Sequence, residues 1–221
     1  MKPEKDVRYI FLARHGATRA NEEGICQGIR LNQTLSPNGE IQAEKLGSFL
    51  RSYCLVKDIG PPLYFISSPL RRAQETKCIV QKAFHDTRYA SISTIHNGFQ
   101  EIDHGEWDGR TWGEIQAHYP DLYETWENDI GALQFPNGES VRQARHRIIS
   151  LFKQLMTWRP RTSNILIVAH GGTNHIILSY VLKTNNLMGF RQDNAALNVI
   201  EYHPQQKSFR VALLNSTAHL L

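Results

Sequence analysis

Short apolar runs that alternate with helix-length amphipathic segments constrain the fold of this chain more than any other feature. Three runs that end abruptly at polar residues or glycine read as buried strands, at residues 9–13, 63–67 and 165–169. The segments between them read as helices over residues 36–50, 70–84 and 140–156. The first helix has Ser36 as its N-cap and Pro37 at its first helical position. This alternation is typical of βαβ units and predicts an α/β fold with a mostly parallel sheet and helices on both faces.

The end of the chain and its middle depart from this alternation. Residues 197–202 and 209–214 read as two strands joined by residues 203–206, which predicts an antiparallel hairpin and therefore a mixed sheet. A weaker β-like stretch covers residues 90–95. Apolar residues at helical spacing over 111–130 are interrupted by Pro120, so we expect a helical insertion at about residues 103–138 that forms a cap over the sheet. With no repeat or linker, residues 1–221 are expected to form one three-layer αβα domain.

Composition narrows the class of protein. Lys and Arg exceed Asp and Glu by only four, 25 against 21, and the basic residues are scattered, so we expect no nucleic acid partner. No apolar run approaches the roughly 18 residues that span a bilayer, and residues 1–6 are charged with no apolar segment behind them, so neither membrane insertion nor secretion is expected. Cys26, Cys54 and Cys78 form no CxxC pair, which favours a reduced, cytoplasmic protein.

Polar residues that directly follow the predicted strands mark the expected ligand site, because open α/β sheets bind ligands beyond the carboxyl ends of their strands. The first three runs are followed respectively by Arg14, His15 and Gly16, by Ser68, Arg71 and Arg72, and by His170, Gly171 and Gly172. Glu101 follows the weaker stretch at residues 90–95. We therefore expect histidines, arginines and one carboxyl group to meet at one edge of the sheet.

These residue types together suit phosphate chemistry. Arginines present donors in a geometry that matches phosphate oxygens, and glycines let backbone N–H groups approach an anion. A neutral imidazole can attack phosphorus, and like charge on the phosphate helps a nearby carboxyl to keep the proton that it donates. Taken singly, each residue has a plain structural interpretation: His15 and His170 as structural histidines, Arg72 in a pair with Glu75, and Glu101 as a solvated loop acid. Their joint placement favours the catalytic interpretation.

Three motifs resemble a known family. Residues 12–18 read LARHGAT, with Asn21 and then Gln27 and Gly28 behind them; residues 67–76 read SSPLRRAQET, and residues 169–172 read AHGG. In this order, and with Glu101 between the last two, they resemble the histidine phosphatase superfamily, which includes cofactor-dependent phosphoglycerate mutases and fructose-2,6-bisphosphatases. The resemblance spans nearly the whole chain.

The resemblance implies a role for each matching residue. His15 is expected to be the nucleophile that forms a phosphohistidine, with Glu101 as the proton donor to the leaving group. Arg14, Arg72 and a protonated His170 are expected to bind the phosphoryl group, whereas Arg71 is not expected to be catalytic. Further contacts are expected from Asn21 and the Gly171 N–H to the phosphate, and from Gln27 and Gly28 to the organic part of the substrate. The family uses no metal, and the sequence holds no metal-binding or nucleotide-binding motif that would argue for a cofactor.

Three functions are compatible with these motifs. The interval between the second and last motifs is shorter than in the phosphoglycerate mutases, and an open cap that admits water favours hydrolysis, so we favour a phosphomonoesterase acting on a small phosphate ester. A cofactor-dependent phosphoglycerate mutase is one alternative. A protein that binds phosphorylated ligands or acts as a scaffold is the other, although every expected catalytic residue type is present.

The substrate and the assembly stay open at this level. The loop at residues 101–109, with His104 three residues beyond the acid, is similar to that of metal-independent phosphoserine phosphatases; His104 either binds a substrate carboxylate or stabilises its loop. The tail at residues 215–221 resembles that of α-ribazole phosphatases, so His219 either folds back towards the pocket or belongs to a frayed terminus. Sugar phosphates are further candidates. Aromatic residues of the insertion form a satellite core or line the pocket, and the hairpin edge offers a surface for a homodimer.

Overall fold

The computed structural model describes residues 7–85, 91–158, 160, 163–187 and 189–221. The charged N-terminus at residues 1–6 and Ala90, where the weak β-like stretch was expected to begin, lie outside the described residues.

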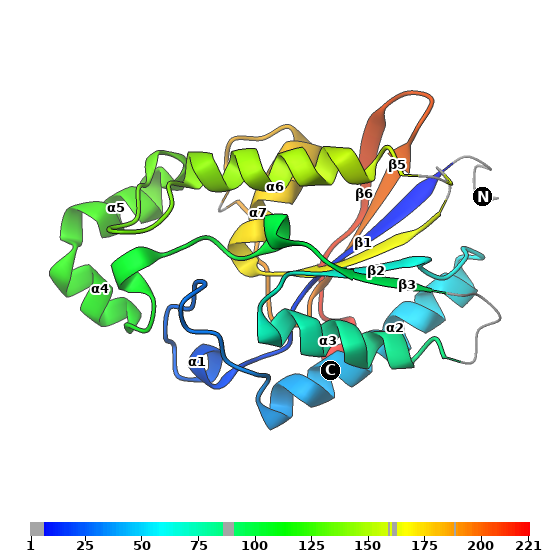
Figure 1. Cartoon of the computed structure of the whole chain (residues 1–221), viewed down its shortest axis with the longest axis horizontal. Coiled ribbons are helices and arrows are strands. Elements are labelled where there is room, and N and C mark those ends of the chain that lie inside the picture. The colour runs from blue at the N-terminus through cyan, green and yellow to red at the C-terminus, as the bar shows by residue number, and fades with distance from the viewer. Residues whose placement is uncertain (1–6, 86–90, 159, 161–162, 188) are drawn as a thin grey trace.

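A six-stranded sheet forms the centre of the molecule (Figure 1). In chain order its strands are β1 (Arg8–Arg14), β2 (Tyr64–Ser67), β3 (Ile92–Ile95), β4 (Ile165–Ala169), β5 (Leu197–His203) and β6 (Ser208–Ser216). They lie in the order β3-β2-β4-β1-β5-β6. The first four of these are mutually parallel, whereas β5 runs antiparallel to β1 and forms a hairpin with β6. The predicted mixed, mostly parallel sheet is confirmed.

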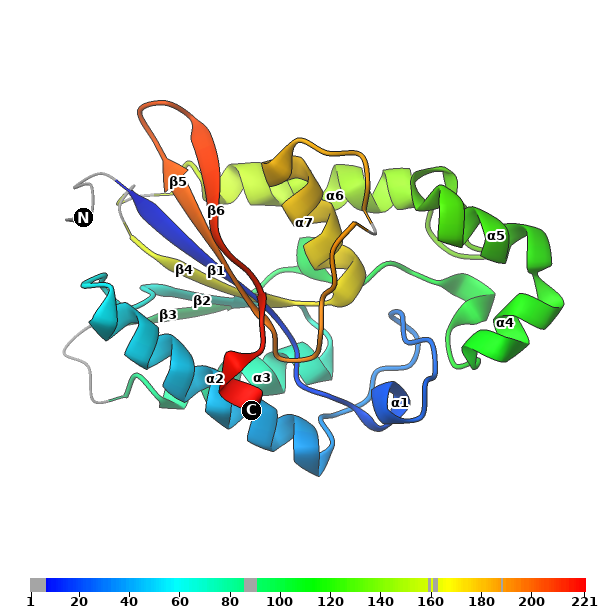
Figure 2. The ribbon, with the colours of Figure 1, turned by 180° about the vertical axis from the view of Figure 1, so that it is seen from behind.

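Helices cover both faces of this sheet, as the two opposite views agree (Figures 1 and 2). The long ones are α2 (Pro37–Val56), α3 (Arg71–Lys82), α6 (Val141–Leu155) and α7 (Gly171–Leu182). Phe11 of β1 packs with α2 and α3 in one apolar cluster, whereas its neighbour Leu12 packs with α6 and α7 in another. All five residues of β4 are buried, because both of its faces are covered. The predicted three-layer αβα architecture is confirmed.

Local signals set where the predicted helices begin. The hydroxyl of Ser36 accepts a hydrogen bond from the Gly39 N–H at 3.1 Å, and Pro37 is the first residue of α2, as predicted. Ser140 caps α6 together with Gln143 in a reciprocal capping box. The sequence of α7 shows no alternation of apolar and polar residues at helical spacing, because this helix is buried on most sides. Its buried residues are Thr173, Asn174, Ile176, Ile177, Leu178, Ser179 and Val181.

The insertion lies at one end of the molecule, beyond the carboxyl ends of the parallel strands (Figure 1). Its elements are the short helix η2 (Gly105–Trp107), α4 (Trp112–His118), α5 (Pro120–Asn128) and the short helix η3 (Ile130–Ala132). The two α-helices meet at Pro120, where the sequence predicted a break. Before the insertion comes η1 (Asn97–Phe99), and near the first strand lies the four-residue α1 (Arg19–Glu22).

The C-terminal tail ends in the short helix η4 (Ala218–Leu220), which packs against α2 (Figure 2). The His219 ring stacks on Phe49 with centroids 5.1 Å apart, and its Nε2 lies 3.1 Å from the Ala195 carbonyl. The tail is therefore docked, but His219 does not line the pocket at the strand ends.

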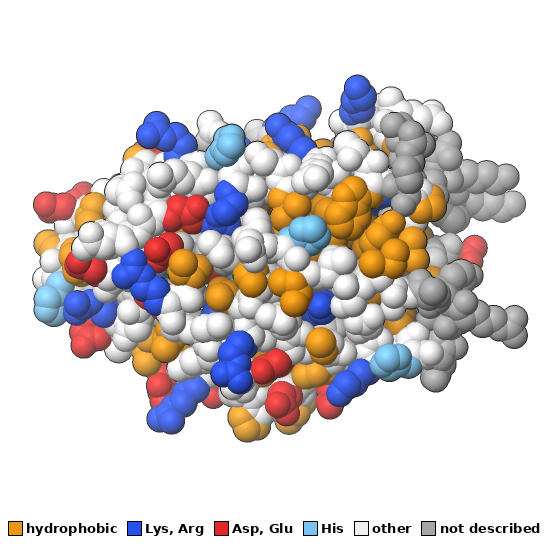
Figure 3. Space-filling model, viewed as in Figure 1, with side chains coloured by type: hydrophobic (Ala, Val, Ile, Leu, Met, Phe, Trp, Pro, Cys, Tyr) orange, Lys and Arg blue, Asp and Glu red, His pale blue; other side chains and the backbone are white. Residues whose placement is uncertain are grey.

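The surface carries charges of both signs. On the face shown in Figure 3, Lys and Arg side chains lie among Asp and Glu side chains rather than in one continuous patch. None of the described helices has the length and apolar character that crossing a lipid bilayer requires.

Candidate active site

The register of the parallel strands brings the polar residues behind them together. Arg14 pairs with Ala169, and Ser67 pairs with Val168, so β1, β2 and β4 end at the same edge of the sheet. The His15 N–H then donates to the Ala169 carbonyl at 3.0 Å. Ser68, His170 and His15 consequently lie in this order along the edge, where the sequence predicted the ligand site.

His15 is buried and its hydrogen bonds define the state of its ring. Nδ1 lies 2.7 Å from the Gly16 carbonyl, which can only accept, so Nδ1 carries the proton and Nε2 keeps its lone pair. Arg72 Nε donates to that Nε2 at 3.2 Å. Burial, then Arg72 and Arg14, lower the pKa of His15 well below its ordinary value. The structure thus holds a neutral imidazole with its basic nitrogen turned towards a guanidinium.

His170 is the second buried histidine of the site, its ring centroid 5.1 Å from that of His15. Its Nδ1 accepts from the same Arg72 Nε at 3.2 Å, and its Nε2 lies 2.7 Å from Ser68 Oγ. Burial first, then Arg72 and His15, lower the pKa of His170 well below its ordinary value. Burial among other basic groups favours the neutral ring here, and the expected protonation of His170 against a phosphoryl group stays a prediction.

Arg72 is the buried arginine of α3, and its Nε hydrogen bonds to both histidines. Its two terminal nitrogens donate to the carbonyls of Gly28 at 2.8 Å and Leu31 at 3.3 Å. Burial lowers the pKa of Arg72 to about 10, which still leaves the guanidinium charged at neutral pH. Arg71 is exposed and is absent from these contacts, in line with the distinction drawn from the sequence.

The loop that holds Arg72 is itself held by Asp108. The Asp108 carboxylate accepts the backbone N–H groups of Gly28 at 3.0 Å, Arg30 at 2.6 Å and Leu31 at 3.3 Å. Gly28 therefore lies behind Arg72, which its carbonyl holds, and its expected contact with substrate stays a prediction. A Cβ at Gly28 would lie 2.9 Å from the Ile102 carbonyl, so this close approach needs glycine.

Arg14 and Glu101 supply the two formal charges on the pocket wall. Arg14 donates to the Gln192 carbonyl at 2.6 Å, which fixes its guanidinium beside Gly171. The Glu101 carboxylate accepts the N–H groups of Gly172 at 3.0 Å and Thr173 at 3.1 Å, and so sits at the N-terminus of α7. A Cβ at Gly172 would lie 2.7 Å from Glu101 Oε1, so a side chain there would displace the carboxylate.

Amide side chains form the polar wall beside His15. Asn21 Oδ1 accepts from the Thr18 N–H and from Asn194 Nδ2, both at 3.1 Å. Gln27 Oε1 accepts from the Thr18 hydroxyl at 3.0 Å, and Asn21, Gln27 and Asn194 all line the pocket. Sequence reasoning missed Gln192 and Asn194 because it searched only after each strand. The start of β5, an antiparallel strand, lies at the same edge of the sheet, so the residues before it were the available signal.

His104 both lines the pocket and stabilises its loop. Its Nδ1 lies 3.2 Å from Cys26 Sγ, and its ring packs on Phe135 with centroids 4.6 Å apart. Burial raises the pKa of the Cys26 thiol, so the sulfur keeps its proton and donates it to His104. Burial also lowers the pKa of His104, which makes its ring a neutral group.

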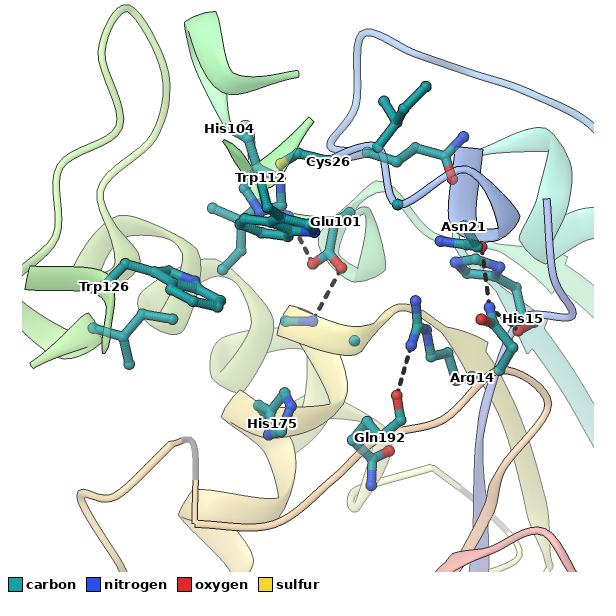
Figure 4. Close-up of a pocket in the computed structure, with 18 of the residues that line it drawn as sticks. Arg14, His15, Asn21, Cys26, Glu101, His104, Trp112, Trp126, His175 and Gln192 are labelled. Carbon is teal, nitrogen blue, oxygen red and sulfur yellow. Dashed lines mark hydrogen bonds between the residues drawn. The ribbon is translucent and has the colours of Figure 1, made fainter. Parts of the chain in front are cut away.

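The cavity enclosed by these residues has a volume of about 400 Å³ and two unlike ends (Figure 4). Arg14, His15 and Asn21 lie at one end, and Trp112 and Trp126 of the insertion lie at the other, with Glu101 between them. Ile130 and Phe135 complete the apolar end. Trp107 is fully buried behind this end, so the aromatic residues of the insertion serve both roles that the sequence left open.

Among the described residues, no group of three or more His, Cys, Asp or Glu side chains is arranged to hold a metal ion. The chemistry available from the described side chains is that of fixed guanidinium charge, a neutral imidazole and a carboxyl group.

Known proteins resemble this chain over nearly its whole length. The family model of the histidine phosphatase superfamily, branch 1, matches residues 10–217. Phosphoserine phosphatase 1 of Hydrogenobacter thermophilus is 27% identical over 96% of this chain and 93% of its own length. A broad-specificity phosphatase of Saccharomyces cerevisiae is 27% identical over 98% of this chain and 89% of its own. The α-ribazole phosphatase structure from Shigella flexneri superposes with a TM-score of 0.77 at 26% identity, covering 94% of this chain and 96% of that one.

The chain therefore belongs to the histidine phosphatase superfamily and is an enzyme of the phosphatase class. The resemblance drawn from the three motifs is confirmed.

Proposed function

We propose that this protein is a metal-independent phosphomonoesterase that hydrolyses a small phosphate ester through a phosphohistidine at His15. The observation that carries the proposal is the state of His15. Its ring is neutral, its unprotonated Nε2 faces the Arg72 guanidinium, and the ring lines the pocket together with Arg14. A nucleophile and the positive charge that its attack requires are thus already in place.

In the first step, His15 Nε2 attacks phosphorus and the ester P–O bond breaks. Arg72 Nε exchanges its contact with Nε2 for a phosphoryl oxygen, and Arg14 binds another, so both guanidinium groups neutralise charge as it develops. Asn21 and the Gly171 N–H add contacts at the same end of the pocket. When Arg72 Nε turns to the phosphoryl group it leaves His170 Nδ1, which then takes up a proton and donates a hydrogen bond to a phosphoryl oxygen, while Nε2 keeps its contact with Ser68.

Glu101 moves the protons. It gives a proton to the leaving oxygen as the P–O bond breaks, and the released alcohol is replaced by water. The carboxylate then takes a proton from that water as the oxygen attacks phosphohistidine, which restores His15 and releases phosphate. The α7 N–H groups hold the carboxylate in one orientation through both steps.

Hydrolysis is favoured over phosphoryl transfer by the cap. In the insertion at about residues 103–138, α4 and α5 place the partly buried rings of Trp112 and Trp126 at the pocket, so this end is not fully closed to water. Gln27 and His104 would contact the leaving group from the opposite wall. A phosphoglycerate mutase and a non-catalytic phospho-ligand-binding protein are the competing functions, and isomerase activity primed by bisphosphoglycerate or a complete lack of hydrolysis would respectively reveal them.

Phosphate release from a panel of monoesters in the presence of EDTA tests the proposal. We expect turnover that EDTA leaves unchanged and vanadate blocks. His15→Asn should abolish turnover, whereas the matched variant His146→Asn, on an exposed position of α6, should keep it. Full activity of His15→Asn, or loss of wild-type activity on chelation, would contradict the mechanism.

A further inference from the structure

The two ends of the pocket differ in charge as well as in shape. Among the lining residues, Arg14 and Glu101 carry the formal charges; Arg14 lies at the end where phosphate would bind, and Glu101 lies between the two ends. The three lining histidines, His15, His104 and His175, have pKa values lowered by burial and are neutral. No lysine or arginine lines the part of the cavity formed by the described residues of the cap.

This distribution disfavours a leaving group with its own negative charge. A carboxylate or second phosphate removed from water needs a cation or several donors to replace its hydration. Arg14 is already engaged with Gln192 and Arg72 with the carbonyls of Gly28 and Leu31, so neither reaches across to the cap. The loop that contains His104 is similar to that of phosphoserine phosphatases. A phosphorylated amino acid bound here would place its carboxylate at the cap, where no positively charged side chain among the described residues lines the cavity.

The cap end instead offers flat apolar surface. The Trp112 and Trp126 indoles stack on each other with centroids 4.8 Å apart and planes inclined by 27°. Both side chains are half-buried and line the cavity with Ile130. A planar ring bound against such a surface gains contact area at little cost in polar desolvation.

We propose that the substrates of this enzyme are phosphate monoesters whose leaving group is uncharged and carries a planar, apolar ring. The ring packs against Trp112 and Trp126 while the phosphoryl group reaches His15. This inference rests on the proposed hydrolytic function and adds the class of leaving group to it.

Three esters of primary alcohols test the inference, because their P–O bonds are chemically alike: 2-phenylethyl phosphate, propyl phosphate and phosphoserine. We expect kcat/KM for 2-phenylethyl phosphate to exceed that for either other ester by about tenfold or more, equal to about 1.4 kcal/mol. An equal or higher kcat/KM for phosphoserine would overturn the inference and leave the phosphatase function standing. Phosphate release from none of the three would instead contradict the proposed function.

Paired tryptophan variants locate the effect. Trp126→Ala should reduce the ratio of kcat/KM for 2-phenylethyl over propyl phosphate towards one, and this ratio does not depend on how much of the variant is folded. Trp158→Ala removes a half-buried indole that packs on Tyr64, outside the pocket, and should leave the ratio unchanged. An unchanged ratio in Trp126→Ala, or an equal fall in Trp158→Ala, would overturn the assignment to the cap.

Discussion

Different kinds of interaction hold the two ends of the pocket: the phosphate end, with Arg14, His15 and Asn21, and the cap end, with Trp112 and Trp126. At the phosphate end, Arg14, Arg72 and Glu101 are each tied by hydrogen bonds to backbone groups of the sheet edge, the α7 N-terminus or a neighbouring loop. At the cap end, Trp112 and Trp126 are held by ring stacking and by packing on the apolar cluster of α6 and α7. Hydrogen bonds impose direction, whereas apolar packing imposes only shape.

In the proposed function, this difference separates the reaction from the selection of substrates. A phosphoryl group in transit needs charges fixed within fractions of an ångström, which the strand ends supply. A leaving group needs only a surface of matching polarity, which two short helices of the insertion supply. Substitutions at the phosphate end should therefore affect all substrates alike, and those at the cap end should discriminate among them.

Arg72→Ala should give the largest loss. Removing the guanidinium that contacts both histidines should lower kcat about 10³- to 10⁵-fold, equally for esters with and without a ring, because it acts on the phosphoryl group. Steady-state kinetics on both esters measures the effect. The neighbouring Arg71→Ala, at an exposed position, is the matched control and should retain wild-type kcat. A loss confined to one class of ester would break the separation of the two ends.

Glu101→Gln should give the next largest loss and should depend on the leaving group. The Gly172 and Thr173 N–H groups bond to different oxygens of the carboxylate, so the amide oxygen can still accept one of them, but the amide holds no transferable proton. We expect kcat/KM to fall about 10²- to 10⁴-fold for propyl phosphate and much less for p-nitrophenyl phosphate, whose leaving group departs without protonation. Equal losses on both esters would remove Glu101 from the role of proton donor.

Asp108→Asn should have a smaller effect that acts through Arg72. The substitution weakens the hydrogen bonds that the side chain accepts from the backbone of residues 28–31. Because a hydrogen bond to a charged group is typically worth about 1.5–3 kcal/mol, we expect kcat to fall roughly tenfold. In an Arg72→Ala background the same change should cost almost nothing. Asp103→Asn, which weakens a partly exposed ion pair with Arg30 and a hydrogen bond from the Gly105 N–H, serves as the control with a lesser loss. Full additivity of Asp108→Asn and Arg72→Ala would exclude this positioning role.

The pH dependence of stability should show the smallest effect. Folding lowers the pKa values of His15 and His170, so below about pH 6.5 the unfolded chain binds more protons than the folded one. The two neutral histidines therefore contribute fully to the free energy of unfolding above about pH 6.5. Below that pH their contribution decreases, and the protein becomes less stable. Urea unfolding at pH 7 and pH 5 should show a smaller decrease in the His15→Asn, His170→Asn double variant than in the wild type. An equal decrease in both would argue against neutral histidines in the folded state.

Sequence patterns predicted the phosphate end far better than the cap end. Strands that finish at His15 and His170 are visible as apolar runs with abrupt ends, and parallel pairing then forces their neighbours together. The antiparallel β5 brings Asn194 to the same edge from the opposite direction, and a search that follows chain order alone does not find it. His175 was missed because α7, which carries it, is buried on most sides and shows no periodicity.

The cap end depends on contacts that no local pattern encodes. The spacing of Trp112 and Trp126 is compatible with either core or pocket, and only the packing of α4 against α5 stacks their rings beside the cavity. Gly28 was predicted to touch substrate, yet its carbonyl holds Arg72, because Asp108, a residue 80 positions away, folds the loop inward. Long-range hydrogen bonds of this kind arise from tertiary structure.

Trapping the reaction intermediate tests the central claim most directly. Enzyme mixed with a ³²P-labelled 2-phenylethyl phosphate for milliseconds, quenched in alkali and digested, should yield one labelled peptide that contains His15 and loses its label in acid. Label on a peptide that contains His170 or Ser68, or rapid turnover with no labelled peptide, would contradict the account.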